Sequence, residues 1–444
     1  MNWKIPESWC VVDLDTICNR ITDGSHNPPA GMPSGLPMLS AKNIKARKIS
    51  FDEYRLISQD AFDHEDKRTS ITPGDVLLTI VGAIGRTAIA LDSHQKFTLQ
   101  RSVAVLKPDA IASKYLSYLL ESPEAQSFFE KNAKGTAQKG IYLKTLGGMK
   151  VPVAPVAEQA RIAQALDGLL AQVDTLKARL DTLPALIKHF RESVLETATS
   201  GKLTENWRKN YGNREWKSIA VGELCRLKSG IAASIDLEHH EGSHKYFKVG
   251  EMNLKGNELY LHETGRYLSL DDFSEKALLP AGSIVFPKRG GAIATNKKRI
   301  LKEESFVDLN VMGLIVPTGV EVLYVYRWLE TIDLAKLNTG TAIPQINNSD
   351  IAPLIIPLPP SDEQYEIVRR VEQLFVFADQ LEARLADARQ RVDALTQSIL
   401  AKAFRGELVP QDPNDEPASV LLERIAAQRA AEPKPKRGRK TAAH

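Results

Sequence analysis

The chain has 444 residues, more than one hydrophobic core usually holds, so we expect two to four domains. Its hydrophobic content of 43% and charged content of 25% are typical of a globular protein, and no apolar run approaches the roughly 18 residues of a membrane span. The formal net charge of +3 neither favours nor excludes a nucleic-acid partner, because local clusters of charge decide that point.

The N-terminal residues MNWKIPESWC contain no apolar stretch, so no secretory signal is predicted. The three cysteines, Cys10, Cys18 and Cys225, are too scattered for a disulfide framework and lack the spacing of metal ligands. Together these features favour a cytoplasmic, reduced protein without a metal site.

Residues 1–150 are predicted to form a mixed α/β domain. The stretches 76–91 and 102–108 have the composition of short strands separated by turns that contain glycine. Residues 114–132, KYLSYLLESPEAQSFFEKN, have the apolar spacing of an amphipathic helix.

The next part of the chain is duplicated. GTAQKGIYLKTLGGMKVPVAPVAEQARI from residue 135 matches GTAIPQINNSDIAPLIIPLPPSDEQYEI from residue 340 at an offset of 205 residues without a gap. The agreement continues beyond these two stretches, and Gly201 and Leu203 match Gly406 and Leu408. A match of this length indicates a repeated module, which must be recognised before a fold is assigned.

Each module continues into a predicted long helix. Its apolar positions recur in alternating steps of four and three residues, which is the period of a coiled-coil seam. The positions are Ile162, Leu166, Leu169, Val173, Leu176, Leu180, Leu183, Ile187, Phe190 and Val194, then Ile367, Val371, Leu374, Ala378, Leu381, Leu385, Ala388, Val392, Leu395 and Ile399. We expect the two helices to pair antiparallel, with one variable domain at each end.

The ends of these helices are also visible in the sequence. Prolines and then Glu158 or Glu363 mark the two starts, and Gly201 and Gly406 are placed to cap the two ends. Pro184 lies inside the first pattern, where we expect it to kink or restart the helix.

Residues 206–355 correspond loosely to the first 150, at offsets that drift between 207 and 210. The aligned pairs are Trp9 with Trp216, Cys18 with Cys225, Asn43 with Asn253 and Lys45 with Lys255. Residues 324–337 are the predicted counterpart of the helix at 114–132. We therefore expect two domains of like fold and divergent surface.

Motifs for catalysis are scarce. No phosphate-binding loop and no dinucleotide fingerprint occurs. Asn27-Pro28-Pro29 resembles an adenine methyltransferase motif, but Ala30 cannot stack on a flipped base. The histidines of EHHEGSHK, residues 238–245, lack a second ligand cluster and indicate a solvated loop. This pattern favours a binding protein.

At this point the chain closely resembles the specificity subunits of type I restriction–modification systems, HsdS. The resemblance is carried by PxxEQxxI at 155–162 and 360–367, by GKLTENWR at 201–208 and by LTQSILAKAFRGEL at 395–408. VRRVEQLFVFAD at 368–379 is similar to the K-type, or IA, branch. The resemblance covers the whole chain and is architectural only in the variable parts.

The resemblance implies an α/β (α+β) protein with two pseudo-repeated target-recognition domains joined by two long antiparallel coiled-coil helices. Each domain reads one half of a bipartite, asymmetric DNA site, and the helices set the spacing. The implied boundaries are 1–150 and 206–355 for the two recognition domains, 151–205 and 356–411 for the helices, and 412–444 for a C-terminal helix and basic tail.

The resemblance also implies partners. Two methyltransferase subunits (HsdM) would bind S-adenosylmethionine and methylate adenine N6, and two ATP-dependent motor-nuclease subunits (HsdR) would complete the complex. S-adenosylmethionine, ATP and Mg²⁺ are expected in those partners, and no cofactor and no catalytic residue is expected in this chain. The conserved helices would dock the methyltransferase subunits.

Clusters of positive charge are the candidates for phosphate contacts. They comprise Lys42, Lys45, Arg47 and Lys48 in the first domain and Lys288, Arg289, Lys297, Lys298 and Arg299 in the second. The basic tail, KPKRGRK at 434–440, is a candidate for non-specific DNA binding.

Base reading favours arginine for guanine and asparagine or glutamine for adenine. The candidates are Asn43, Arg86 and Arg101 in the first domain and Asn253, Arg289, Asn296 and Asn347 in the second. The repeat-related pair Asn43 and Asn253 indicates either a shared phosphate contact or a shared turn.

Two other functions fit the sequence less well. A coiled-coil scaffold without a DNA role predicts no salt-dependent DNA binding. A stand-alone methyltransferase or endonuclease predicts S-adenosylmethionine binding or DNA cleavage by the chain alone.

Overall fold

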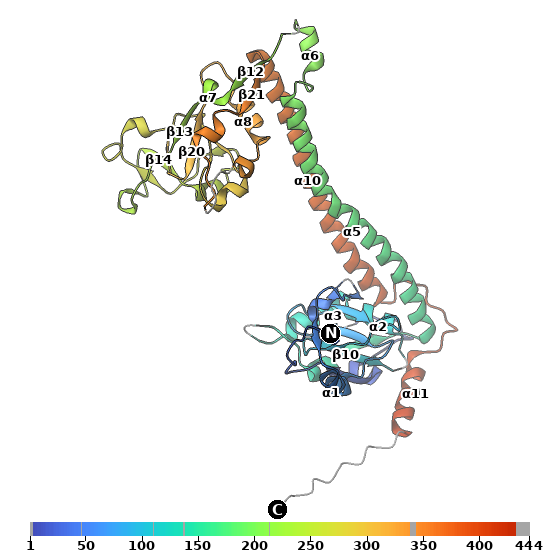
Figure 1. Cartoon of the computed structure of the whole chain (residues 1–444). Coiled ribbons are helices and arrows are strands. Elements are labelled where there is room, and N and C mark those ends of the chain that lie inside the picture. The colour runs from blue at the N-terminus through green and yellow to red at the C-terminus, as the bar shows by residue number, and fades with distance from the viewer. Residues whose placement is uncertain are drawn as a thin grey trace, which may run out of the picture. The chain divides into compact units, whose positions relative to one another are not determined.

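The computed structural model describes residues 3–45, 47–109, 111–135, 138–212, 214–337 and 343–431. The chain divides into two compact units (Figure 1). Unit 1 comprises Met1–Asp181 and Asp387–His444, and unit 2 comprises Thr182–Ala386. Each unit mixes sheet and helix, so the predicted fold class is confirmed.

Unit 1 is built around an antiparallel sheet with the strand order β2-β10-β7-β8. Its central strands are buried on both faces, as their continuous apolar sequence requires. These strands are β2 (Cys18–Asp23), β7 (Val76–Thr79), β8 (Thr87–Ile89) and β10 (Val103–Pro108). A second sheet contains β3 (Leu36–Leu39), β6 (Arg55–Ile57) and β9 (Thr98–Leu99), and shorter pairs are β1 (Cys10–Asp13) with β11 (Lys150–Val153) and β4 (Ile44–Lys45) with β5 (Lys48–Ile49).

The same part of unit 1 contains the helices α1 (Gln59–Thr69), α2 (Ser113–Leu120), α3 (Pro123–Asn132) and α4 (Leu143–Gly147). The prediction of one helix over 114–132 was therefore wrong. Ser122 accepts a hydrogen bond from the Ala125 amide at 3.3 Å, and Pro123 occupies the first turn of α3. A capping serine followed by proline starts a new helix at this point.

Unit 2 repeats the arrangement. Its main sheet has the order β13-β20-β17-β18-β15, in which the first four strands correspond to β2-β10-β7-β8. The strands are β13 (Arg226–Ser229), β15 (Tyr260–Leu261), β17 (Ile284–Pro287), β18 (Arg299–Leu301) and β20 (Val311–Ile315). The smaller sheets contain β14 (His244–Phe247), β16 (Tyr267–Leu268) and β19 (Phe306–Val307), and β12 (Lys217–Ala220) with β21 (Ile355–Leu358).

The helices of unit 2 between residues 205 and 351 are short. They are α6 (Glu205–Asn210), α7 (Val221–Leu224), α8 (Val322–Glu330) and α9 (Asn348–Ile351). The helix predicted over 324–337 ends at Glu330, and a separate 3-10 turn, η7 (Leu334–Leu337), follows it.

The repeated PxxEQ motif fixes the start of each long helix. The Trp9 indole donates to Glu158 at 2.8 Å, and the Trp216 indole donates to Glu363 at 2.9 Å. The following residue, Gln159 or Gln364, accepts from the backbone amide in front of α2 or α8 at 3.0 and 2.8 Å. The aligned tryptophans and the motif thus make the same contacts in both units.

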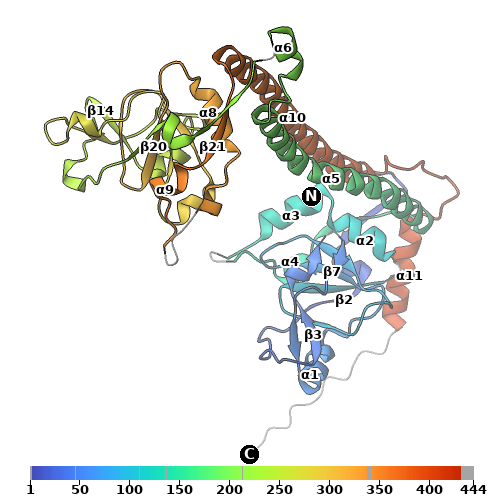
Figure 2. The same cartoon turned by 45° about the horizontal axis from the view of Figure 1, so that its top comes forward.

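The long helices are α5 (Val156–Thr199) and α10 (Ser361–Ala403), which lie side by side (Figure 2). In unit 1, Lys177 pairs with Asp393 at 2.7 Å. In unit 2, Arg191 pairs with Asp379 at 2.6 Å. Residue numbers rise along one helix as they fall along the other, so the predicted antiparallel pairing is confirmed.

Pro184 lies inside α5, which continues through it, so the helix does not restart there. Proline leaves the carbonyl four residues earlier without its helical donor. That carbonyl belongs to Leu180, and Arg389 of α10 donates to it at 3.3 Å while also pairing with Asp181 at 3.0 Å. The partner helix thus supplies the hydrogen bond that the proline removes. Gly201 and Gly406 follow the helix ends with φ of 77° and 73°, as predicted for C-terminal caps.

A final helix, α11 (Ala418–Ala431), packs on unit 1 through the buried side chains of Ala418, Leu421 and Ile425. Arg429 donates to the Cys18 carbonyl at 2.9 Å and fixes the C-terminal end of this helix. The predicted basic tail at 434–440 lies outside the described residues. No helix within the described ranges is long and apolar enough to cross a membrane.

Candidate nucleic-acid interface

A hollow of about 400 Å³ opens on unit 1, and several loops line it. Three of them follow β7, precede β10 and contain the 3-10 turn η2 (Ala41–Asn43), and residues after β2 and Gln138 complete the lining. Three predicted site residues, Lys42, Arg86 and Arg101, line the hollow, and all three side chains are exposed. The fold therefore gathers cations that are up to 59 residues apart in the sequence, although no local cluster joins them.

Glycines shape the loop after β7. Gly82 and Gly85 have φ of 77° and 90°, which residues with side chains rarely adopt. The Gly82 amide donates to the Lys139 carbonyl at 3.1 Å, and the Arg86 amide donates to the Thr79 hydroxyl at 2.9 Å. These bonds hold the backbone and leave the Arg86 guanidinium directed to solvent.

Sequence reasoning missed the amide side chains in this hollow. Gln100 and Gln138 line it together with the three cations. Glutamine is a natural reader of adenine and arginine of guanine, so the hollow combines donors and acceptors that suit base edges. The only sequence signal for Gln100 is its position next to Arg101, and Gln138 follows residues 136–137, which the structure does not describe.

Of the other three cations in the first basic cluster, two are exposed to solvent and one is held by ion pairs. Lys45 and Lys48 are exposed and face each other across the β4–β5 hairpin. Arg47, between them, pairs with Glu121 at 3.4 Å and also with Asp174 of α5. Its guanidinium connects the hairpin to two helices, so the geometry assigns Arg47 a structural role in place of a phosphate contact.

Asn43 is buried and also structural. Its amide donates to the carbonyls of Ser50 and Glu53 at 2.9 and 2.8 Å, and its oxygen accepts from the Ser40 amide at 3.0 Å. Asn253 does not occupy the matching position. The third residue of the corresponding turn, η4 (Val249–Asn253), is Glu251, which accepts from the Lys248 amide at 2.9 Å.

The alignment of Asn43 with Asn253 was therefore wrong. The two turns begin at Ala41 and Val249, an offset of 208 residues and not the 210 used in that alignment. Of the two readings left open for this pair, the turn applies to Asn43. Asn253 is exposed and accepts a hydrogen bond from Lys297.

Most of the second basic cluster is engaged in structure. Lys298 is only 3% exposed and donates to the Asn296 side chain at 2.8 Å and the Ile332 carbonyl at 2.7 Å. Arg299 donates to the carbonyls of Lys298 and Met252 at 2.7 and 3.0 Å. Asn296 also accepts from the Leu334 amide at 2.9 Å. We withdraw these three residues as DNA contacts, because their polar groups hold the loop before β18.

Three other predicted residues of unit 2 lie nearer the surface. Arg289 is exposed. Lys288 is half-buried, donates to the Ser229 hydroxyl at 2.7 Å, and has its pKa lowered by burial and by the adjacent Arg289. Asn347 caps α9 and accepts from the Gln345 side chain at 2.8 Å, which ties its oxygen to the loop. Arg289 is thus the freest of the second group.

The burial of Lys298 predicts that the free energy of unfolding depends on pH. Desolvation lowers its pKa to about 8 from 10.5, against the opposing charges of Glu330 and Asp333. The unfolded chain keeps this proton up to about pH 10.5, so the penalty of burying the charge is full below pH 8 and disappears as the pH rises to 10.5. Relative to Lys298→Met, the wild-type free energy of unfolding should rise over this window by at most about 3 kcal/mol. Denaturant unfolding at pH 7.5 and 9.5 tests this, and parallel pH dependences would contradict it.

No group of three or more metal-ligating side chains that could hold an ion occurs in the described parts of the chain. The histidines predicted to lie in a solvated loop follow the 3-10 turn η3 (Ile235–Leu237), and His239 and His240 precede β14. The His239 backbone pairs with that of Tyr267.

Comparison with known proteins agrees with this architecture. The family described as type I restriction modification DNA specificity domain matches residues 31–185 and 213–388. The EcoKI specificity subunit of Escherichia coli K12 is 28% identical, with 98% of this chain and 99% of that protein covered. The StySPI specificity subunit of Salmonella potsdam is 30% identical, with 99% of both chains covered.

Solved structures show the same fold. The HsdS subunit from Thermoanaerobacter tengcongensis has a TM-score of 0.57 at 18% identity, covering 91% of this chain and 99% of that one. A chain from a study of assembly and conformational transition in the type I R-M system has a TM-score of 0.66 at 17% identity, covering 92% and 100%. With two like units, paired helices and matches along nearly its full length, the chain belongs to the family of type I restriction–modification specificity subunits, with the predicted similarity to the K-type confirmed.

Proposed function

We propose that the chain reads a bipartite, asymmetric sequence in double-stranded DNA, with residues 1–150 and 206–355 each reading one half. The observation that carries this is the hollow of unit 1, where Lys42, Arg86 and Arg101 meet two glutamines. Cations suit phosphates and guanine, and glutamine suits adenine, so the set has the chemistry of a base-reading surface. The corresponding loops of unit 2 carry different side chains, which accounts for an asymmetric target.

We further propose that α5 and α10 set the number of unread base pairs between the halves. Two half-sites are read together only when the reading domains are held at a fixed separation along the duplex. The antiparallel helices are tied by side-chain pairs in both units, which suits them to act as a stiff spacer.

The same helices supply surface for partners. Leu176, Leu183 and Leu395 belong to the coiled-coil seam, yet 37–45% of each remains exposed. Exposed leucines in a seam favour burial by further helices. We propose that two methyltransferase subunits dock there, bring S-adenosylmethionine and take up the flipped adenine. Two motor-nuclease subunits would bring ATP and Mg²⁺.

The test uses the assembled methyltransferase and a duplex that carries its own site. Each of Arg86→Ala and Arg101→Ala should weaken binding by about 1–3 kcal/mol if the arginine contacts a guanine with both donors. The matched control is Arg20→Ala, an exposed arginine of β2 outside the hollow. Unchanged DNA affinity in both variants would contradict the proposal that the hollow reads the DNA sequence.

Mapping N6-methyladenine in genomic DNA gives both half-sites and the spacer in one experiment. A wild-type complex that binds DNA without salt dependence, or that methylates no bipartite motif, would contradict the proposed function.

A further inference from the structure

The loops of unit 2 that correspond to the hollow of unit 1 can be identified from backbone hydrogen bonds. Three bonds of 2.8–3.1 Å recur in both units. They run from Ile80, Gly82 and Ile141 to Ser102, Lys139 and Ile80 in unit 1, and from Lys288, Gly290 and Ile346 to Asn310, Pro344 and Lys288 in unit 2. Gly82 and Gly290 have the same φ of 77°. The two sets of loops therefore have one backbone framework.

This framework pairs the side chains of the two surfaces. Gln100 corresponds to Asp308, because both form a parallel bridge with the segment that follows the first sheet strand. By the same register, Ser102 corresponds to Asn310 and Val81 to Arg289. The neutral amide at this place in unit 1 is thus a carboxylate in unit 2.

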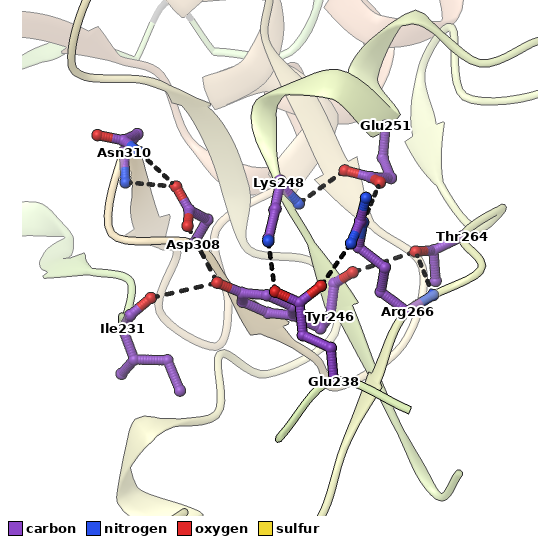
Figure 3. Close-up of polar contacts among 9 residues, drawn as sticks. All are labelled: Ile231, Glu238, Tyr246, Lys248, Glu251, Thr264, Arg266, Asp308 and Asn310. Atoms are coloured by element: carbon purple, nitrogen blue, oxygen red, sulfur yellow. Dashed lines mark hydrogen bonds and ion pairs between the residues drawn. The ribbon is translucent and has the colours of Figure 1, made fainter. Parts of the chain in front are cut away.

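Asp308 is held in a fixed orientation (Figure 3). One carboxylate oxygen accepts from the Asn310 backbone amide at 2.9 Å and from its side-chain amide at 2.7 Å. The other oxygen accepts from the Tyr246 hydroxyl at 3.0 Å. Burial and the charge of Asp308 both raise the pKa of Tyr246, so the phenol stays protonated and keeps donating. A carboxylate accepts about four hydrogen bonds, so one acceptor position remains open.

The charge of Asp308 is not neutralised. The nearby acids Glu238 and Glu251 are paired with Lys248 and Arg266 (Figure 3). Across the described residues, by contrast, no cation lies within ion-pairing distance of Asp308. A free carboxylate opposes phosphate groups, and at a DNA surface its favourable partner is the exocyclic amino group of a base.

Building on the proposed function, we propose that Asp308 is a specificity-determining residue of the second half-site, where its open acceptor position receives a hydrogen bond from the exocyclic amino group of a cytosine or adenine. Tyr246 and Asn310 are its positioning residues. Arg289, which lies on the same framework beyond β17, supplies the complementary donors for a guanine or a phosphate.

The experiment compares methylation motifs of assembled complexes that contain the full chain. In Asp308→Asn the side chain keeps its shape but gains a donor in place of an acceptor. We expect the base preference at one position of the second half-site to change by roughly ten- to a hundredfold, with the first half-site and the spacer unchanged. Asp308→Gln, which installs the side chain found in unit 1, should shift the same position toward adenine.

Glu223→Gln is the matched control, because Glu223 is an exposed acid on α7 at the other end of β13. An unchanged motif in both Asp308 variants would overturn the inference while leaving the proposed function intact. Failure of Asp308→Asn to assemble would also overturn it, since that result assigns the carboxylate a structural role. Absence of any bipartite motif with the wild-type chain would instead contradict the proposed function itself.

Discussion

Arg327→Ala is expected to lower the free energy of unfolding of unit 2 by about 3 kcal/mol or more, because it leaves two carboxylates without their cation. Arg327 is 7% exposed and donates to Glu330 at 2.6 Å and to Glu372 of α10 at 2.7 Å. Its guanidinium also lies 4.7 Å from the centre of the Phe375 ring. The residue thus joins α8 to the long helix by charge and by stacking.

Unit 1 offers a matched comparison for this prediction. There Tyr118 of α2 takes the place of Arg327 and donates to Asp167 of α5 at 2.6 Å. Tyr118→Phe removes one hydrogen bond and should cost only about 1 kcal/mol. Arg369→Ala removes an exposed arginine from Glu366, which keeps its second partner Arg370, and should cost less still. Denaturant unfolding of the full chain measures all three, and a loss below 1 kcal/mol in Arg327→Ala would contradict the anchoring role.

Removing one heptad from each long helix is expected to shorten the spacer between the methylated half-sites by up to three base pairs. Seven helical residues span about 10 Å, and the duplex rises about 3.4 Å per base pair. Residues 178–184 of α5 and 386–392 of α10 face each other according to the observed ion pairs. Their joint removal takes out Pro184 together with Arg389 and leaves the Lys177–Asp393 and Arg191–Asp379 pairs in place.

The two halves of the recognised sequence should stay the same in this variant, since no residue of either hollow or loop framework changes. The control removes 178–184 alone, which shifts the facing side chains out of register and should abolish assembly. Mapping N6-methyladenine reads the spacer directly. An assembled double-deletion complex with an unaltered spacer would refute the idea that the helices set this distance.

The sequence predicted the parts of this protein that depend on local periodicity. The seam of α5 and α10 follows from spacing, because a helix presents every third or fourth residue on one face. The duplicated module follows from matching the chain with itself, and the antiparallel pairing follows from the direction of the chain. The tryptophan–glutamate contacts could also have been predicted, since both partners recur in the repeat. Segment ends were less certain, as the division of residues 114–132 into α2 and α3 shows.

The site could be predicted only in part, because charge clusters in a sequence do not tell which charges are free. Lys42, Arg86 and Arg101 line one hollow. Arg47, by contrast, forms an ion pair with Asp174, a residue 127 positions away. Lys298 and Arg299 belong to the same basic run as the exposed Arg289, yet they point into the domain and bond to backbone carbonyls. Gln100 carried no signal beyond its position next to Arg101, and Asp308 carried none, since their importance depends on which loops they face.

By itself, then, the sequence determined the architecture of two like domains and two paired helices, because spacing and internal repetition are written along the chain. The family followed from the resemblance of motifs such as PxxEQxxI at 155–162 and 360–367 to those of the specificity subunits. Only the tertiary structure decided which polar groups remain available to a ligand. That choice depends on partners brought together from distant segments, and a buried charge must find such a partner whatever its neighbours in sequence.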